Sequence, residues 1–152
     1  MSVDIINGRS PTANVITGGQ PSEAQFSAFR ATAQGPCRVI NLRGGGEPGV
    51  MAQAALMAHL GIDYVHLPVS GPADVSFEAA TALSSALEYD GPVLVHCASG
   101  NRVGALRALG AFQHEEGCDV AKALVIGRQW GLTRMEPMVA GILRTAEQAR
   151  PS

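Results

Sequence analysis

The sequence has few aromatic side chains, few charges and no excess of cations. Aromatic residues make up 5% and charged residues 16% of the 152 positions, and the formal net charge is −2. The arginines are scattered without a run of four or five, so the chain lacks the basic patch that binds a nucleic-acid backbone. We therefore expect no nucleic-acid partner.

Long apolar runs are missing as well. The opening MSVDIINGRS contains no positive segment followed by an apolar stretch, so it does not have the pattern of a signal peptide. No later run of about 18 apolar residues is long enough to span a bilayer. We expect a cytoplasmic protein with no membrane partner.

Cysteine is scarce, with only Cys37, Cys97 and Cys118. Their odd number and wide separation do not form a disulfide framework, and neither a CxxC pair nor histidines at zinc spacing are present. We expect no metal, no cofactor and at least one free thiol.

The patterns that are present alternate between helix and strand. Apolar spacing and capping signals predict helices over residues 22–34, 49–60, 77–90, 103–116, 119–129 and 137–149, and strands over 38–42, 64–69 and 93–95. The length suits one compact domain over residues 1–152, and no repeat or linker interrupts it. The alternation predicts an α/β fold, a three-layer sandwich with a mostly parallel central sheet.

Two of the predicted strands have distinct places in that sheet. Val93-Leu94-Val95 is continuously apolar, which is typical of a central strand covered by helices on both faces. Residues 64–69 alternate between apolar and polar positions and include Pro68, which favours a half-buried strand near an edge.

The segment that carries chemistry follows the central strand and reads His96-Cys-Ala-Ser-Gly-Asn-Arg102. In a strand, loop and helix arrangement, the amides of residues 98–102 point inward and the helix N-terminus adds partial positive charge. That field attracts an anion and favours the thiolate of Cys97, which is the nucleophilic form of cysteine. A buried structural cysteine is the alternative for Cys97.

The neighbours of Cys97 favour the nucleophile. Gly100 lets the backbone adopt positive φ and approach a ligand closely, and Arg102 offers a planar fork for two oxygens of a tetrahedral anion. His96 either orients the loop through hydrogen bonds or is a satisfied core residue. The predicted binding residues around an oxyanion are His96, Ala98, Ser99, Gly100, Asn101, Arg102 and, at the end of the strand 38–42, Arg43.

Four segments of the chain resemble a known family: Ile16–Ser22, Val39–Arg43 followed by Glu47, Gly61–Val69, and His96–Arg102. They are similar to the bacterial beta-lactamase-hydrolase-like phosphatase-like domain, a relative of the dual-specificity and tyrosine phosphatases, over most of the chain. The resemblance implies a tyrosine-phosphatase-like fold and a cysteine-dependent phosphatase. By it, Cys97 attacks phosphorus to form a phosphocysteine, Arg102 and the loop amides hold the oxygens, and an aspartate protonates the leaving group.

The resemblance points to Asp74 as that general acid, because Asp74 follows the strand 64–69 in the loop where the relatives keep theirs. A helix N-cap is the alternative role of Asp74, and Asp63 is the second candidate for the acid. Arg43 and Glu47 flank a triple glycine, and Arg43 either lines the same mouth or forms a structural ion pair.

Two departures from the tyrosine phosphatases leave other functions open. Four residues, not five, separate Cys97 from Arg102, and Val103 stands where the phosphatases have Ser or Thr. The six-residue loop has the length found in rhodanese-type sulfurtransferases. The hypotheses are a phosphatase acting on a phosphorylated small molecule or phosphoprotein, a sulfurtransferase forming a Cys97 persulfide from thiosulfate or a related sulfur donor, and a non-catalytic oxyanion or phosphopeptide binding module.

Overall fold

The structure is a computed structural model that describes residues 3–150. Within this range the strands are β1 (Arg9–Thr12), β2 (Val15–Gly18), β3 (Arg38–Asn41), β4 (Asp63–His66) and β5 (Val93–His96). The helices are α1 (Glu23–Thr32), α2 (Val50–Leu60), α3 (Phe77–Leu87), α4 (Asn101–His114), α5 (Val120–Gln129) and α6 (Glu136–Ala149), with a short 3-10 helix η1 (Pro72–Asp74) before α3.

The strands form one sheet in the order β1-β2-β5-β3-β4. Strands β2, β5, β3 and β4 run parallel, and β1 pairs antiparallel with β2 at one edge. The α/β class and the mostly parallel sheet are therefore confirmed. All four residues of β5 are buried at the centre, whereas β4 is half-exposed at the opposite edge, as the apolar and alternating patterns predict.

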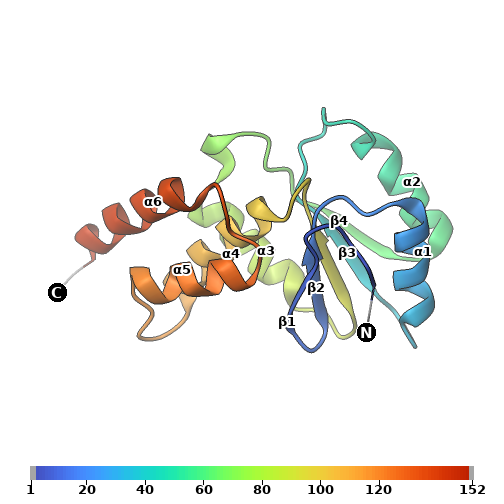
Figure 1. Ribbon diagram of the computed structural model, residues 1–152, viewed down its shortest axis with the longest axis horizontal. Coiled ribbons are helices and arrows are strands. Elements are labelled where there is room, and N and C mark those ends of the chain that lie inside the picture. Colours follow the sequence, from blue (N-terminus) through green and yellow to red (C-terminus); the bar gives the residue numbers. More distant parts are fainter. Residues whose placement is uncertain (1–2, 151–152) are drawn as a thin grey trace.

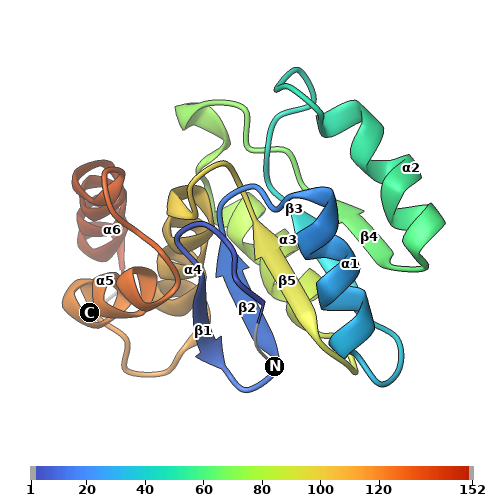
Figure 2. The ribbon, with the colours of Figure 1, turned by 45° about the vertical axis from the view of Figure 1, so that its right-hand side comes forward.

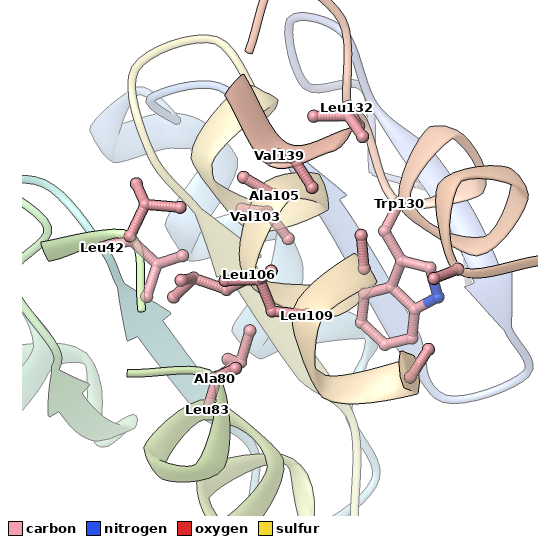
Figure 3. Close-up of a cluster of buried hydrophobic side chains, with 14 of the residues drawn as sticks. Leu42, Ala80, Leu83, Val103, Ala105, Leu106, Leu109, Trp130, Leu132 and Val139 are labelled. Atoms are coloured by element: carbon pink, nitrogen blue, oxygen red, sulfur yellow. The ribbon is translucent and has the colours of Figure 1, made fainter. Parts of the chain in front are cut away.

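Helices cover both faces of the sheet, which gives the predicted three layers (Figures 1 and 2). Helices α1 and α2 lie on one face, and α3 and α4 lie on the other with α5 and α6 packed beyond α4. Figure 3 shows the larger core, in which Leu106 and Leu109 of α4 pack between Leu83 of α3 and Trp130. The smaller core lies under α1 and α2 and includes Phe26 and Phe29.

One close approach fixes the segment that connects α5 to α6. A Cβ at Gly104 in α4 would lie 2.0 Å from the backbone nitrogen of Leu132, so only glycine lets the chain pass this near to the helix. The connecting segment is therefore held against the first turns of α4.

The sequence patterns missed β1 and β2. Strand β1 reads RSPT, which has no apolar residue apart from Pro11, and the two apolar residues of β2, which reads VITG, are adjacent and do not alternate. Pairing with β5 decides that β2 is extended, and this pairing is a long-range contact. Elsewhere the capping box of Ser22 and Gln25 begins α1 as predicted. No helix among residues 3–150 has the length and apolar character to cross a membrane.

Candidate active site

The parallel strands end in register, and this edge of the sheet carries the site. Gly18, His96 and Asn41 are paired neighbours at the carboxyl ends of β2, β5 and β3. The loops that follow these strands therefore converge, which is where ligands bind in open α/β sheets. Cys97 comes directly after His96 and begins the loop that leads into α4.

The loop folds back over the sulfur of Cys97. Gly100 has φ of 92°, and its N–H donates to Cys97 Sγ over 3.0 Å. Cys97 is fully buried beneath this turn. The neighbouring chain holds the loop in place, because Gln20 N–H donates to Ala98 O over 3.2 Å and Asn7 Nδ2 donates to Ser99 O over 3.0 Å.

Arg102 lies in the first turn of α4, and part of its guanidinium is already engaged. Nη1 and Nη2 donate to the two carboxylate oxygens of Glu47 over 2.7 and 2.9 Å, and Nη1 also donates to Val69 O over 2.9 Å. A guanidinium has five N–H donors. Glu47 and Val69 use three of the five, and Nε–H and one Nη2–H of Arg102 remain as a second fork beside Cys97, whose side chain also interacts with Arg102.

Glu47 orients Arg102 and cannot act as an acid near neutral pH. The hydrogen bonds from Arg102 are the main cause that lowers the pKa of the Glu47 carboxyl to about 2, with help from the Gly44 N–H and from Arg43. The same pairing raises the pKa of Arg102. A carboxylate that stays ionised can fix a cation but has no proton to give.

Arg43, at the end of β3, contacts protein groups behind the loop. Its guanidinium donates to Gln20 Oε1 and to Pro48 O, both over 2.9 Å, and its Nε lies 3.3 Å from Glu47 Oε1. These contacts hold the loop that carries Glu47. Of the two roles considered for Arg43, they correspond to the structural ion pair.

A directed chain of hydrogen bonds runs from Arg43 to His96. Arg43 donates to Gln20, Gln20 Nε2 donates to Gln53 Oε1 over 3.2 Å, and Gln53 Nε2 lies 2.8 Å from His96 Nε2. Because the amide oxygen of Gln53 is an acceptor in this chain, its nitrogen donates and His96 Nε2 accepts.

The other ring nitrogen of His96 then carries the proton. Nδ1 lies 3.2 Å from Cys97 O and donates to it. Burial is the main cause that lowers the pKa of His96 to about 4, so the ring is neutral at physiological pH. His96 thus holds the peptide that follows Cys97 in place, which is the orienting role considered from the sequence.

A hollow of about 310 Å³ opens beside the loop. The loop contributes Ala98, Ser99, Asn101 and Arg102, and the opposite wall and rim are formed by Val69, Ser70, Gly71, Pro72, Arg134 and Met135. Cys97 itself lies below these residues and does not line the hollow.

The two aspartates considered as the general acid lie elsewhere. Asp74 accepts a hydrogen bond from Ser70 N–H over 2.9 Å and lines a separate hollow against α3, whose N-cap is Ser76. Asp63 begins β4 at the amino edge of the sheet, where it pairs with Arg38. No carboxylate is among the residues that line the hollow beside Cys97.

Asn101 has a structural role in addition to lining the hollow. Its buried side chain turns toward the segment before α6, where Oδ1 accepts from Thr133 N–H over 2.9 Å and Met135 N–H over 3.4 Å. Val103 is fully buried in the core, so position 103 offers no donor to the site.

Three contributors were not identified from the sequence as parts of the site: Gln20, Gln53 and Arg134. Gln53 stands alone as a polar side chain in the middle of an apolar helix, and it is buried there. Such a residue signals a satisfied polar contact, but its partner becomes visible only when β5 and α2 are placed together. Arg134 has no local signal at all.

Sequence comparison places these features in a family. The family profile described as "Beta-lactamase hydrolase-like protein, phosphatase-like domain" matches residues 12–113. The Beta-lactamase hydrolase-like protein of Agrobacterium fabrum is 35% identical over 96 residues, which are 60% of this chain and 22% of that protein. The Beta-lactamase hydrolase-like protein of Xylella fastidiosa is 31% identical over 123 residues, which are 70% of this chain and 28% of that protein. The chain spans less than a third of these relatives.

Solved structures share the fold. A DUF442 protein of Shewanella putrefaciens CN-32 has a TM-score of 0.67 at 21% identity and covers 93% of both chains. A kinase-associated phosphatase has a TM-score of 0.67 at 13% identity over 98% of this chain and 96% of that chain. The fold is therefore that of the tyrosine and dual-specificity phosphatases, as the resemblance implies.

Proposed function

This chain belongs to the family of phosphatase-like domains found in beta-lactamase hydrolase-like proteins, and we propose that it is a cysteine-dependent phosphatase whose nucleophile is Cys97. The observation that carries the proposal is the set of hydrogen-bond donors that surround Cys97 Sγ. Cys97 Sγ accepts the Gly100 N–H at the N-terminus of α4, and Arg102 keeps one fork of two N–H groups that neither Glu47 nor Val69 uses. Donors in this arrangement favour both a thiolate and the anion that it attacks.

The reaction follows from these groups. The thiolate of Cys97 attacks phosphorus, the bond from phosphorus to the leaving oxygen breaks, and a phosphocysteine forms. Arg102 and the amides of the loop bind the non-bridging oxygens, whose charge they neutralise. Water then attacks phosphorus, the sulfur–phosphorus bond breaks with its electrons returning to Cys97, and phosphate leaves. The substrate is a phosphorylated small molecule or phosphoprotein.

The leaving group needs a proton, and no carboxylate is among the residues that line the hollow. We propose that Asp74 supplies the proton after a shift of the loop that contains Ser70, Gly71 and Pro72, because this loop already forms a wall of the hollow. The burial of Cys97 likewise requires residues 98–100 to open before the sulfur meets substrate. Substrates with good leaving groups should therefore react much faster than alkyl phosphates.

Sulfur transfer is the second candidate, and the lack of a carboxylate around the hollow favours it. With thiosulfate, the Cys97 thiolate attacks the outer sulfur, the sulfur–sulfur bond breaks and sulfite leaves with the electron pair. The resulting persulfide passes its outer sulfur to an acceptor such as cyanide. Sulfite is a stable anion at neutral pH, so this route needs no general acid.

One set of assays separates the candidates. The purified chain is assayed on p-nitrophenyl phosphate and on thiosulfate with cyanide, together with Cys97→Ser and the control Cys118→Ser, which removes a thiol beyond the far end of α4. We expect hydrolysis of p-nitrophenyl phosphate that C97S abolishes and C118S retains. If thiocyanate forms and p-nitrophenyl phosphate is not hydrolysed, the chain is a sulfurtransferase. If both activities are absent, the remaining hypothesis is an oxyanion or phosphopeptide binding module.

A further inference from the structure

A second hollow adjoins the one beside Cys97. It has a volume of about 570 Å³, and its lining shares Ser99 and Arg134 with the first hollow. We refer to the two adjoining hollows together as the trough, and their linings include Arg102, Arg134 and Arg9. No aspartate or glutamate lines either hollow, although the chain as a whole has more acidic than basic residues.

The loop from Cys97 to Arg102 holds the backbone around Arg134 in place. The backbone amides on both sides of Arg134, those of Thr133 and Met135, donate to the buried Asn101 Oδ1, which lies next to Arg102. Gly131 has φ of 118° and packs so tightly that a Cβ would lie 2.7 Å from Gly100 O. The segment is thus fastened to the Cys97 loop at two points, and Arg134 stands at the rim of the trough for that reason.

The charge of Arg134 is not neutralised in the described part of the chain. Within residues 3–150, no carboxylate lies within ion-pair distance of Arg134 or Arg9. Glu136, two residues after Arg134, instead accepts two hydrogen bonds of 2.7 Å from Arg128. Arg102 is held by Glu47, so the trough contains one oriented cation and two unpaired ones.

We propose that this trough binds a second phosphate of the substrate, with Arg134 as its main contact and Arg9 and Ser99 beyond it. The inference rests on the proposed function, since the first phosphate occupies the loop above Cys97. A planar guanidinium suits phosphate oxygens, and an unpaired one has its donors available. The substrate class is therefore a phosphomonoester that carries a further phosphate group close to the one removed.

Binding of inorganic phosphate and tripolyphosphate tests the proposal. Both ligands are titrated calorimetrically into the full chain carrying Cys97→Ser, which prevents turnover, alone and combined with Arg134→Gln. The matched control is Arg144→Gln, which removes an equal charge from an exposed position on α6. We expect R134Q to weaken tripolyphosphate binding about fivefold, as for loss of one exposed ion pair, and phosphate binding less than about twofold.

The outcomes distinguish the subsite from the catalytic proposal. A loss of tripolyphosphate affinity in R144Q equal to that in R134Q would overturn the subsite, because only net charge would then matter. Equal losses for phosphate and tripolyphosphate in R134Q would also overturn it. Hydrolysis of p-nitrophenyl phosphate by the wild-type chain tests the phosphatase separately from the subsite, because this substrate has one phosphate.

Discussion

Cys97 and Cys118 flank the same helix, one before the start of α4 and one after its end, and both are buried. Cys97 Sγ accepts a backbone N–H and has Arg102 nearby. Burial raises the pKa of Cys118, and the carboxylates of Glu115 and Asp119 raise it further. Because both thiols are buried, they differ in the groups around them: an N–H and a guanidinium lie beside Cys97, and carboxylates lie beside Cys118.

Replacement of Arg102 should have the largest effect on the activity that we assign to Cys97. We expect Arg102→Lys to lower kcat/KM for p-nitrophenyl phosphate roughly a hundredfold or more, because an ammonium cannot pair with both oxygens of Glu47 and still offer a fork to the substrate. Steady-state kinetics measure the effect. Arg107→Lys on the same helix is the control, and an equal loss there would indicate damage to α4.

His96 should make stability depend on pH. A histidine in the unfolded chain titrates near pH 6.5, whereas the pKa of buried His96 is about 4. Between these values the unfolded state binds more protons, so the free energy of unfolding falls as pH drops from 6.5 to 4, by on the order of 3 kcal/mol. Urea unfolding across this range measures it. His96→Asn should flatten the slope, and a slope that persists in this variant would assign it elsewhere.

Alkylation compares the two cysteines directly. We expect iodoacetamide at pH 6.5 to modify Cys97 about ten times faster than Cys118, because the Gly100 N–H donates to Cys97 Sγ, whereas burial and nearby carboxylates raise the pKa of Cys118. Mass spectrometry of digested peptides gives both rates from one sample. Saturating phosphate should protect Cys97 alone. Equal rates without protection would contradict the anion site.

Substitution of Gln53 should have the smallest effect on the rate, but it should change the tautomer of His96 in a way that spectroscopy detects. Gln53→Glu replaces the amide N–H that donates to His96 Nε2 with a carboxylate oxygen, which can only accept. We therefore expect the ring proton to move to Nε2 and the pKa of His96 to rise. Nitrogen chemical shifts of the ring report the tautomer. We expect kcat to fall only a few-fold, about 1 kcal/mol, since Gln53 acts through His96. An unchanged tautomer would remove Gln53 from this role.

Much of the site was predictable from the sequence because its central loop is continuous. A buried strand, a cysteine, a positive-φ glycine and an arginine in the first helical turn follow one another between Val93 and Arg102, so local rules place them together. Strands β1 and β2 were not predictable, because neither shows a clear period of two and each is extended through its pairing, β1 with β2 and β2 with β5.

The sequence alone determined the alternation of helices and strands, the central position of β5 and the loop from Cys97 to Arg102, since each of these depends on residues near one another in the chain. Only the tertiary structure decided that Glu47 grips Arg102, that Gln20 and Gln53 link Arg43 to His96, and that Arg134 borders the same trough. Those contacts join residues 23 to 55 positions apart, and nothing in local propensity specifies which distant loops meet at the carboxyl edge of the sheet.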